Sequence, residues 1–199
     1  MQSLLLASSN PGKIHEIRSL LENLSLILVT PTSLGKHLQV AEDGSNYAEN
    51  ASRKAIAYTR ATGLMTLADD SGLEVDALGG LPGLHSARFS PLPHATDADR
   101  RQHLLSMLWD HPRPWLAHFH CTVALATPGG EVYFAVGDCP GEIIPQELGQ
   151  HGFGYDPIFM IPALGKTMAE LTTAEKNTLS HRALAVKGLR PILLQLLTA

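Results

Sequence analysis

Two adjacent aspartates, Asp69 and Asp70, follow an apolar run at residues 64–68 and precede Ser71 and Gly72. The apolar run predicts a buried strand, and the serine and glycine predict a turn after it. Ligands of α/β proteins bind at the carboxyl ends of the strands, and Mg²⁺ prefers oxygen ligands. The pair therefore predicts a metal-binding or catalytic site; a hydrogen-bonded turn at a strand end is the alternative.

If both aspartates lie in the strand, their side chains point to opposite faces. We then expect different roles for them, one binding metal or activating water and the other bracing the turn. Glu42, in a predicted loop at residues 30–46, supplies a further carboxylate for a magnesium site.

Residues 8–13, Ser-Ser-Asn-Pro-Gly-Lys, connect a predicted strand at 4–7 with a helical pattern at 13–24. Asn10 suits the cap position and Pro11 the first position of that helix. Free backbone amides and the positive end of the helix dipole favour a phosphate there, and Lys13 adds a charge. The spacing is not that of a Walker A loop. The alternative is a capped helix with a surface lysine.

Two later polar clusters also lie near predicted element ends. In residues 153–156, Phe-Gly-Tyr-Asp, an aromatic ring is suited to stacking on a base; core packing is the alternative, above all for Tyr155. Residues 175–182 place cationic donors near a helix start, where they oppose the helix dipole. A locally unfavourable choice indicates a functional role, and these donors suit a carbonyl or phosphate oxygen.

A helix is predicted over residues 47–62, ending at Gly63. Glu49, Asn50, Arg53 and Lys54 lie on one side of it. That pattern is typical of a solvent-exposed face with a Glu49–Arg53 ion pair.

The 199-residue chain is 44% hydrophobic and 17% charged, which suits a folded domain with a sizeable core. Its net charge of −4 argues against a nucleic-acid partner or an anionic membrane surface. No apolar run approaches the roughly 20 residues that span a bilayer, and the first residues lack a signal-peptide pattern. We expect a cytoplasmic protein in which Cys121 and Cys139 are buried free thiols, although a hairpin would permit a disulfide.

Strands alternate with helices along the chain, and a hairpin is predicted from 115–126 and 131–136 around the turn at 128–130. This order predicts an α/β fold with a mixed central sheet flanked by helices. We expect one domain over residues 1–199, with the hairpin region, about 112–150, as a second lobe. The last helix starts near residue 180, and Pro191 is expected to kink or restart it.

The clusters, taken in order, resemble the inosine triphosphate pyrophosphatase family. Residues 9–13 resemble its SNxGK element, and residues 69–73, 80–83 and 86–88 resemble its DDSGL, GxPG and SAR elements. Residues 152–159 match its GFGYDPIF element, and residues 175–182 its EK and SHR elements. The likeness runs from about residue 4 to 189.

The resemblance implies a two-lobed fold with the active-site cleft between the lobes, a homodimer, and Mg²⁺-dependent hydrolysis of deaminated purine nucleoside triphosphates to monophosphate and pyrophosphate. It implies that Asp70 is the catalytic base and, with Glu42, a metal ligand. The substrate contacts that it implies are Ser8, Ser9, Asn10, Pro11, Gly12, Lys13, Ser71, Phe153, Gly154, Tyr155, Asp156, Lys176, His181 and Arg182.

Under this hypothesis, donors from His181 and Arg182 would pair with a 6-oxo purine and reject adenine, whose 6-amino group is itself a donor. They would not exclude guanine. One alternative is a pyrophosphatase for modified pyrimidine triphosphates. Another is a regulator that binds nucleotides without hydrolysis, against which the set of acids Glu42, Asp69 and Asp70 speaks.

Overall fold

The structure, a computed structural model, describes residues 2–198. The strands are β1 (Gln2–Leu6), β2 (Leu26–Val29), β3 (Met65–Val75), β4 (Trp115–Ala126), β5 (Val132–Ile143), β6 (Phe159–Ile161) and β7 (Lys166–Thr167). The α-helices are α1 (Pro11–Leu21), α2 (Tyr47–Thr62), α3 (Asp97–Leu108), α4 (Thr173–Leu179) and α5 (His181–Thr198). The strands form one sheet in the order β2-β1-β3-β4-β5-β6-β7, with parallel and antiparallel pairs. The predicted mixed α/β fold is confirmed.

The chain divides into two compact units. The first unit comprises Met1–Asp70, Cys121–Gly137 and His181–Ala199, and the second comprises Ser71–His120 and Asp138–Ser180. The boundaries fall within β3, β4 and β5 and between α4 and α5, rather than near residues 112 and 150. A separate hairpin lobe over those residues stays a prediction.

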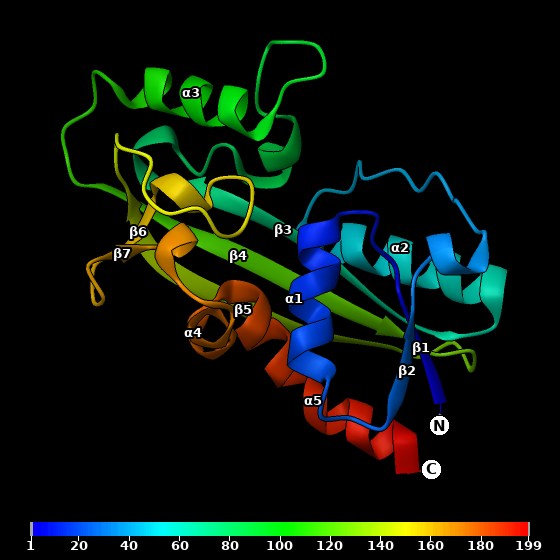
Figure 1. Ribbon diagram of the computed structural model, residues 1–199. Helices are drawn as coiled ribbons and strands as arrows, with labels where there is room; N and C mark the ends of the chain where they lie inside the picture. The colour runs from blue at the N-terminus through cyan, green and yellow to red at the C-terminus, as the bar shows by residue number, and fades with distance from the viewer. Residues whose placement is uncertain (1, 199) are drawn as a thin grey trace. The chain divides into compact units, whose positions relative to one another are not determined.

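In the first unit, β1 pairs in parallel with both β2 and β3, with Leu4 opposite Met65 and Leu6 opposite Leu67. Because side chains alternate along a strand, Leu4 and Leu6 join one core cluster with α1 and α5. Leu5 joins another cluster with α2. Helices α1 and α5 pack against each other in Figure 1. The two faces of the strands therefore meet different helices.

The two helices that border the candidate site begin as expected. Asn10 caps α1 by accepting a hydrogen bond from the Lys13 amide, and Asn46 caps α2 in the same way from the Glu49 amide. Helix α2 ends at Gly63, whose φ of +70° lies in the left-handed region that favours glycine.

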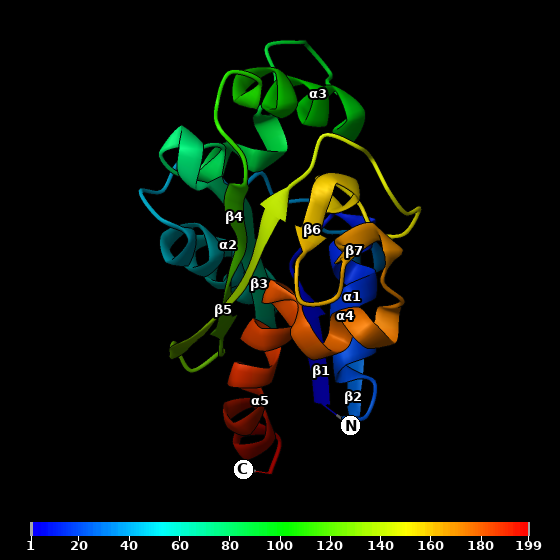
Figure 2. The ribbon, with the colours of Figure 1, turned by 90° about the vertical axis from the view of Figure 1, so that its left-hand side faces the viewer.

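In the second unit, α3 contributes Leu104 and Leu108 to a core cluster that includes Trp115, Phe119 and Phe159. The short strands β6 and β7 pair antiparallel, with Met160 opposite Thr167 (Figure 2). Thr96 caps α3 through a reciprocal bond pattern with Asp99.

Two expected element ends are wrong. Strand β3 does not end at the aspartates but continues to Val75. Leu73 and Val75 are fully buried in the same core cluster as Trp115 and Phe159. Strand β5 does not end at residue 136, as the predicted hairpin implied, but continues to Ile143. Helix α5 runs through Pro191 as one element, so the helix does not restart there, and a kink at Pro191 stays a prediction.

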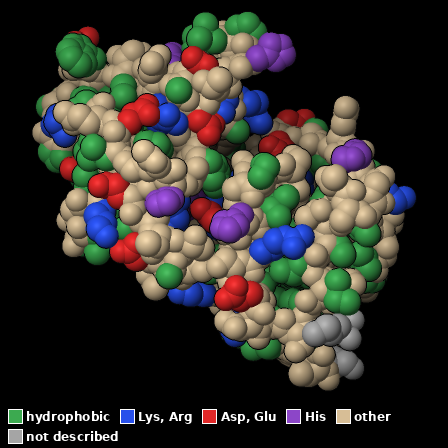
Figure 3. Space-filling model, viewed as in Figure 1, with side chains coloured by type: hydrophobic (Ala, Val, Ile, Leu, Met, Phe, Trp, Pro, Cys, Tyr) green, Lys and Arg blue, Asp and Glu red, His purple; other side chains and the backbone are tan. Residues whose placement is uncertain are grey.

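Within residues 2–198, no helix has the length and apolar character needed to span a bilayer. On the face in Figure 3, the acidic and basic side chains of the described residues are interspersed rather than gathered into a broad area of one sign.

Cys121 and Cys139 are both buried and free. Burial raises the pKa of Cys121 to about 12 and that of Cys139 to about 11. At pH 8 the reactive thiolate is therefore less than about 1% of either side chain.

We expect iodoacetamide to label neither cysteine in the folded protein and both in guanidinium chloride, as counted by intact-mass spectrometry. Rapid labelling of the native protein at either position would contradict the burial.

Candidate functional site

The two aspartates of β3 point to opposite faces, as expected for neighbouring residues in a strand. Met65 and Leu67 face the cluster that contains α1 and α5, and Asp69 continues that series. Ala68 faces the cluster that contains α2, and Asp70 continues the other series. The hydrogen-bond partners follow the same division, since Asp69 contacts residues of α1 and α5 and Asp70 contacts a residue of α2.

Asp69 is the centre of a buried ion-pair network in the first unit. Its Oδ2 lies 2.9 Å from Lys13 Nζ and 3.2 Å from Arg182 Nε and Nη2. Arg182 Nη1 also donates to Glu16 Oε2 on α1. Asp69 and Arg182 are each only 1% exposed.

The charges in this network fix one another's ionisation. Burial alone would raise the pKa of Asp69, but Lys13, Arg182 and Lys54 outweigh it and hold the pKa well below its usual range. Burial likewise opposes the charge of Arg182, and Asp69 and Glu16 reverse that effect and raise its pKa. Asp69 is therefore an ionised group at any physiological pH.

Asp70 has the opposite electrostatic setting. Burial raises its pKa, and this exceeds the lowering by Lys54, by the hydrogen bond from Asn50 and by Lys13. Asn50 Nδ2 donates to Asp70 Oδ2 at 2.9 Å. A carboxyl group with a raised pKa is a better proton acceptor than an ordinary aspartate.

The expected solvent-exposed face of α2 is wrong in part. The Glu49–Arg53 ion pair is present and accessible, but Asn50 is buried and Lys54 is half-buried. Lys54 Nζ donates to the Asp69 backbone carbonyl at 2.6 Å and lies 2.8 Å from Glu42 Oε1. Burial lowers the pKa of Lys54, but Asp69 and Glu42 more than compensate and raise it, so its ammonium group stays charged.

Residues 8–13 form the turn into α1. Asn10 Oδ1 accepts from the Lys13 amide at 3.1 Å, and Ser8 Oγ accepts from the Asn10 amide at 3.2 Å. The Asn10 side chain thus serves as a helix cap, and the Lys13 ammonium group lies against Asp69. A helix N-terminus flanked by a lysine remains a setting in which an anion is stabilised.

The second unit holds another group of predicted site residues. Lys176 Nζ lies 2.6 Å from Asp156 Oδ2, and both side chains are buried. The same Oδ2 accepts from the Phe153 amide at 3.2 Å. Gly152 has φ of +86°, and a Cβ there would lie 1.9 Å from Asp156 Oδ2, so this turn requires glycine.

Helix α3 anchors that turn from the other side. Asp97 Oδ2 accepts from the Gly154 amide at 2.7 Å, and Arg101 Nη1 donates to the Gly154 carbonyl at 2.8 Å. Arg101 also makes two 2.8 Å bonds to the Glu147 carboxylate. Tyr155 is buried, and its hydroxyl donates to the Ser86 carbonyl at 2.9 Å, which is the core-packing alternative for that residue.

The predicted site residues thus belong to two sets, one in each unit. The first unit holds residues 8–13, the acids Glu42 and Asp70, and His181 and Arg182 at the start of α5. The second holds Ser71, residues 153–156 and Lys176. The Arg182 guanidinium group is taken up by Asp69 and Glu16, so the expected contact between Arg182 and a purine stays a prediction.

Several residues of these networks were not expected as site residues, namely Glu16, Asn50, Lys54, Ser86, Asp97, Arg101 and Glu147. Glu16 lies three positions after Lys13, a spacing that puts both on one face of α1. The other contacts join residues far apart in the chain and leave no short-range signal.

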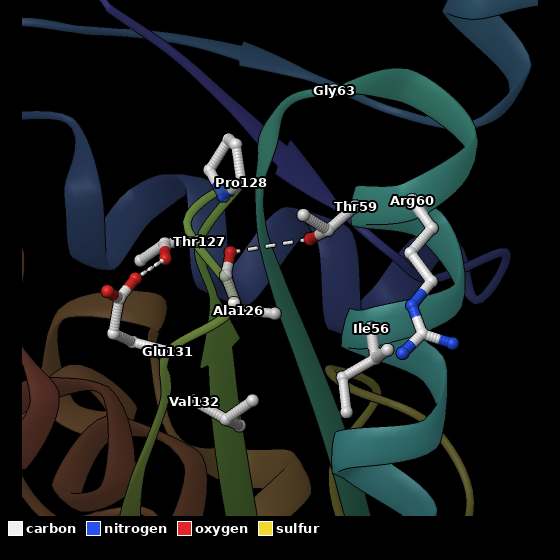
Figure 4. A pocket seen from close by; sticks show the side chains of 10 residues that line it. Ile56, Thr59, Arg60, Gly63, Ala126, Thr127, Pro128, Glu131 and Val132 are labelled. Carbon is white, nitrogen blue, oxygen red and sulfur yellow. Dashed lines mark hydrogen bonds between the residues drawn. The ribbon is translucent and has the colours of Figure 1, made fainter.

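The first unit also contains a cavity of about 320 Å³. Its lining comes from the last turns of α2 and from the turn between β4 and β5 (Figure 4). Thr59 Oγ1 donates to the Ala126 carbonyl at its edge. None of the predicted site residues lines this cavity.

Among residues 2–198 there is no cluster of three or more His, Cys, Asp or Glu side chains arranged as a metal cage. Mg²⁺ is usually held by one or two carboxylates together with waters and substrate phosphates. Glu42 and Asp70, near enough for Glu42 to raise the pKa of Asp70, match that donor set.

Comparisons with known proteins agree on one family. The model of the Ham1 family matches residues 4–192. Two proteins named dITP/XTP pyrophosphatase are similar, one from Desulforamulus reducens (43% identity, covering 96% of this chain and 94% of that protein) and one from Yersinia pseudotuberculosis (45%, covering 94% and 95%). A HAM1 protein structure from Coxiella burnetii superimposes with a TM-score of 0.87 at 38% identity, covering 98% of this chain and 100% of that one.

The Asp69 network predicts a large stability effect. We expect Asp69→Asn to lower the free energy of unfolding by about 3–5 kcal/mol, because two cations lose their buried counter-charge. Asp43, the 75% exposed partner of Arg53, is the control: Asp43→Asn should cost less than about 1 kcal/mol.

The same measurement has a pH dependence. The folded pKa of Asp69 lies below the unfolded value, so its stabilisation is present above about pH 4 and lost as the pH falls further. In urea titrations, the difference between wild type and Asp69→Asn should narrow from pH 6 to pH 3. A difference that stays constant would show that the Asp69 charge is not the cause.

Proposed function

We propose a nucleotide-hydrolase function for this chain, which belongs to the Ham1 family. The substrates are deaminated purine nucleoside triphosphates such as dITP, ITP and XTP, and the products are the monophosphate and pyrophosphate. Relatives of 43–45% identity over nearly the whole chain carry the name dITP/XTP pyrophosphatase, and this supports both the reaction and the substrate class.

The observation that carries the proposal is the placement of two neighbouring carboxylates on opposite faces of β3, with Asp69 against Lys13 and Arg182 and Asp70 against Asn50. The pKa of Asp69 is lowered and that of Asp70 is raised. Two acids whose environments push their pKa values apart are suited to different tasks in one reaction. Asp69 keeps the cations in place as a permanent anion, and Asp70 is the group able to take a proton.

In the proposed reaction, a water molecule attacks the α-phosphorus and the bond from this phosphorus to the bridging oxygen of pyrophosphate breaks. Asp70 orients the water and accepts its proton. Lys13 and the amides at the start of α1 stabilise the negative charge that moves onto the leaving pyrophosphate. Lys54 holds its positive charge beside both aspartates.

We propose that Glu42 and Asp70 hold Mg²⁺ together with the substrate phosphates. The ion would neutralise phosphate charge and favour release of pyrophosphate. The chemistry of the donors supports this choice, since both are carboxylates and Mg²⁺ prefers oxygen ligands.

For the base, the proposal relies on the residues that match the family elements. Phe153 is half-buried beside the Asp156–Lys176 pair, and its ring is suited to stack on a purine. Donors from Lys176 or His181 would favour a 6-oxo group. That one nucleotide engages both units, that the enzyme is a homodimer, and that it works in the cytoplasm are parts of this proposal carried by the resemblance.

Substrate choice is the first test. With Mg²⁺, we expect pyrophosphate release from ITP, dITP and XTP with a kcat/KM about 10- to 100-fold above that for ATP, because adenine leaves donors unpaired. Modified pyrimidine triphosphates are assayed in parallel. Equal turnover of ATP would contradict the assigned specificity, and ITP that stays intact after long incubation would favour a regulator that only binds.

Asp70 is the second test. Asp70→Asn keeps the shape of the side chain but cannot accept a proton, so we expect kcat to fall by about 10²–10⁴. Its unfolding midpoint in urea should stay near that of wild type. Asp110→Asn, at an exposed position after α3, is the matched control and should keep full activity. Near-normal turnover by Asp70→Asn would remove its catalytic role.

A further inference from the structure

Asn50 is a buried amide that joins two parts of the first unit. It lies in the first turn of α2 and is 1% exposed. Its Oδ1 accepts from the Gly44 amide at 2.8 Å, and its Nδ2 donates to Asp70 Oδ2 at 2.9 Å. One side chain therefore connects the loop before α2 with the middle of β3.

We propose that Asn50 is a positioning residue that sets the orientation of the Asp70 carboxylate and the place of the loop that carries Glu42. This inference rests on the proposed function, because it gives Asn50 its role through Asp70 and Glu42. From the sequence, Asn50 was assigned to a solvent-exposed face of the helix, and that interpretation did not indicate this role.

The Asn50 amide satisfies both neighbours. The Gly44 N–H requires an acceptor, and the Asp70 carboxylate requires a donor. Reversing the Asn50 amide would set N–H against N–H at Gly44 and oxygen against carboxylate at Asp70. An aspartate would keep the first contact and place a second negative charge against Asp70. A leucine of similar size would keep neither.

The loop approaches Asn50 so closely that a side chain at position 44 would displace the Asn50 amide. A Cβ at Gly44 would lie 2.6 Å from Asn50 Oδ1 and 3.1 Å from the Glu49 side chain. Two residues earlier, Glu42 pairs with Lys54 at 2.8 Å. Asn50 and Lys54 are one turn apart on α2, so the helix holds the stretch 42–44 at both ends.

The size of the effect follows from how such partners act. Groups that orient a metal-binding or catalytic carboxylate typically change activity by 10- to 100-fold when they are removed. Because Asn50 contacts no substrate in this proposal, the loss should appear in kcat, with KM for ITP changed less than about threefold.

The test compares Asn50→Ala and Asn50→Asp with Thr59→Ala. Thr59 lies on the same helix, is 6% exposed and donates one hydrogen bond to the Ala126 carbonyl. Thr59→Ala is therefore the control for losing a buried hydrogen bond on α2 without a change at Asp70. We expect kcat for ITP to fall about 10- to 100-fold in both Asn50 variants and to stay within twofold in Thr59→Ala. Amide exchange at Gly44 should accelerate in Asn50→Ala and stay near wild type in Asn50→Asp.

Other outcomes overturn the inference. An Asn50→Asp enzyme with wild-type kcat would show that donation to Asp70 is not needed. An equal loss of kcat in Thr59→Ala would reduce the effect to stability. If KM rises and kcat does not change, Asn50 has another role.

A readout without turnover separates this inference from the proposed function. The shifts in urea midpoint caused by Asn50→Ala and Asp70→Ala should not add in the double variant, since each removes the same hydrogen bond. If wild type releases no pyrophosphate from ITP, the proposed function fails, while this cycle still decides the link between Asn50 and Asp70. Additive shifts would overturn the link.

Discussion

The buried contact of Asp69 with Lys13 and Arg182 is the constraint on which the first unit depends. It joins α1, β3 and α5 at one carboxylate oxygen. Removing such charges from water is expensive, and the expense is offset only when every charge has close partners. Glu16 supplies the remaining counter-charge for Arg182. The helices are therefore held by a polar network as well as by their apolar faces.

The alternation of side chains along β3 then gives Asp69 and Asp70 different surroundings. Asp69 faces the ion-pair network and Asp70 faces α2, although the two are neighbours in one strand. The network holds the Lys13 ammonium group in the first turns of α1, and the proposed phosphate contact is at this helix N-terminus. On the other face, burial raises the pKa of Asp70, and Asn50 donates a hydrogen bond to its carboxylate. The function proposed for this family member draws on both faces.

Local signals predicted much of this from the sequence. Residues close together in the chain were enough to predict the cap at Asn10, the helix at 47–62 and its end at Gly63. The end of β3 did not, because Ser71 and Gly72 resemble a turn until the burial of Leu73 is known. The partners of Arg182 lie 113 and 166 residues away, and no periodicity reports such pairing. Asn50 has a helical spacing that looks exposed, and only its tertiary neighbours show otherwise.

The placement of two different tasks on consecutive residues of β3 has a consequence for how this chain can change over time. Adding or deleting one residue upstream in that strand would turn Asp69 toward α2 and Asp70 toward Arg182, since a shift of one position exchanges the faces. Point substitutions can accumulate one at a time, but length changes there exchange both tasks together. In the part of β3 that precedes the two aspartates, relatives should therefore differ by substitutions and not by insertions or deletions.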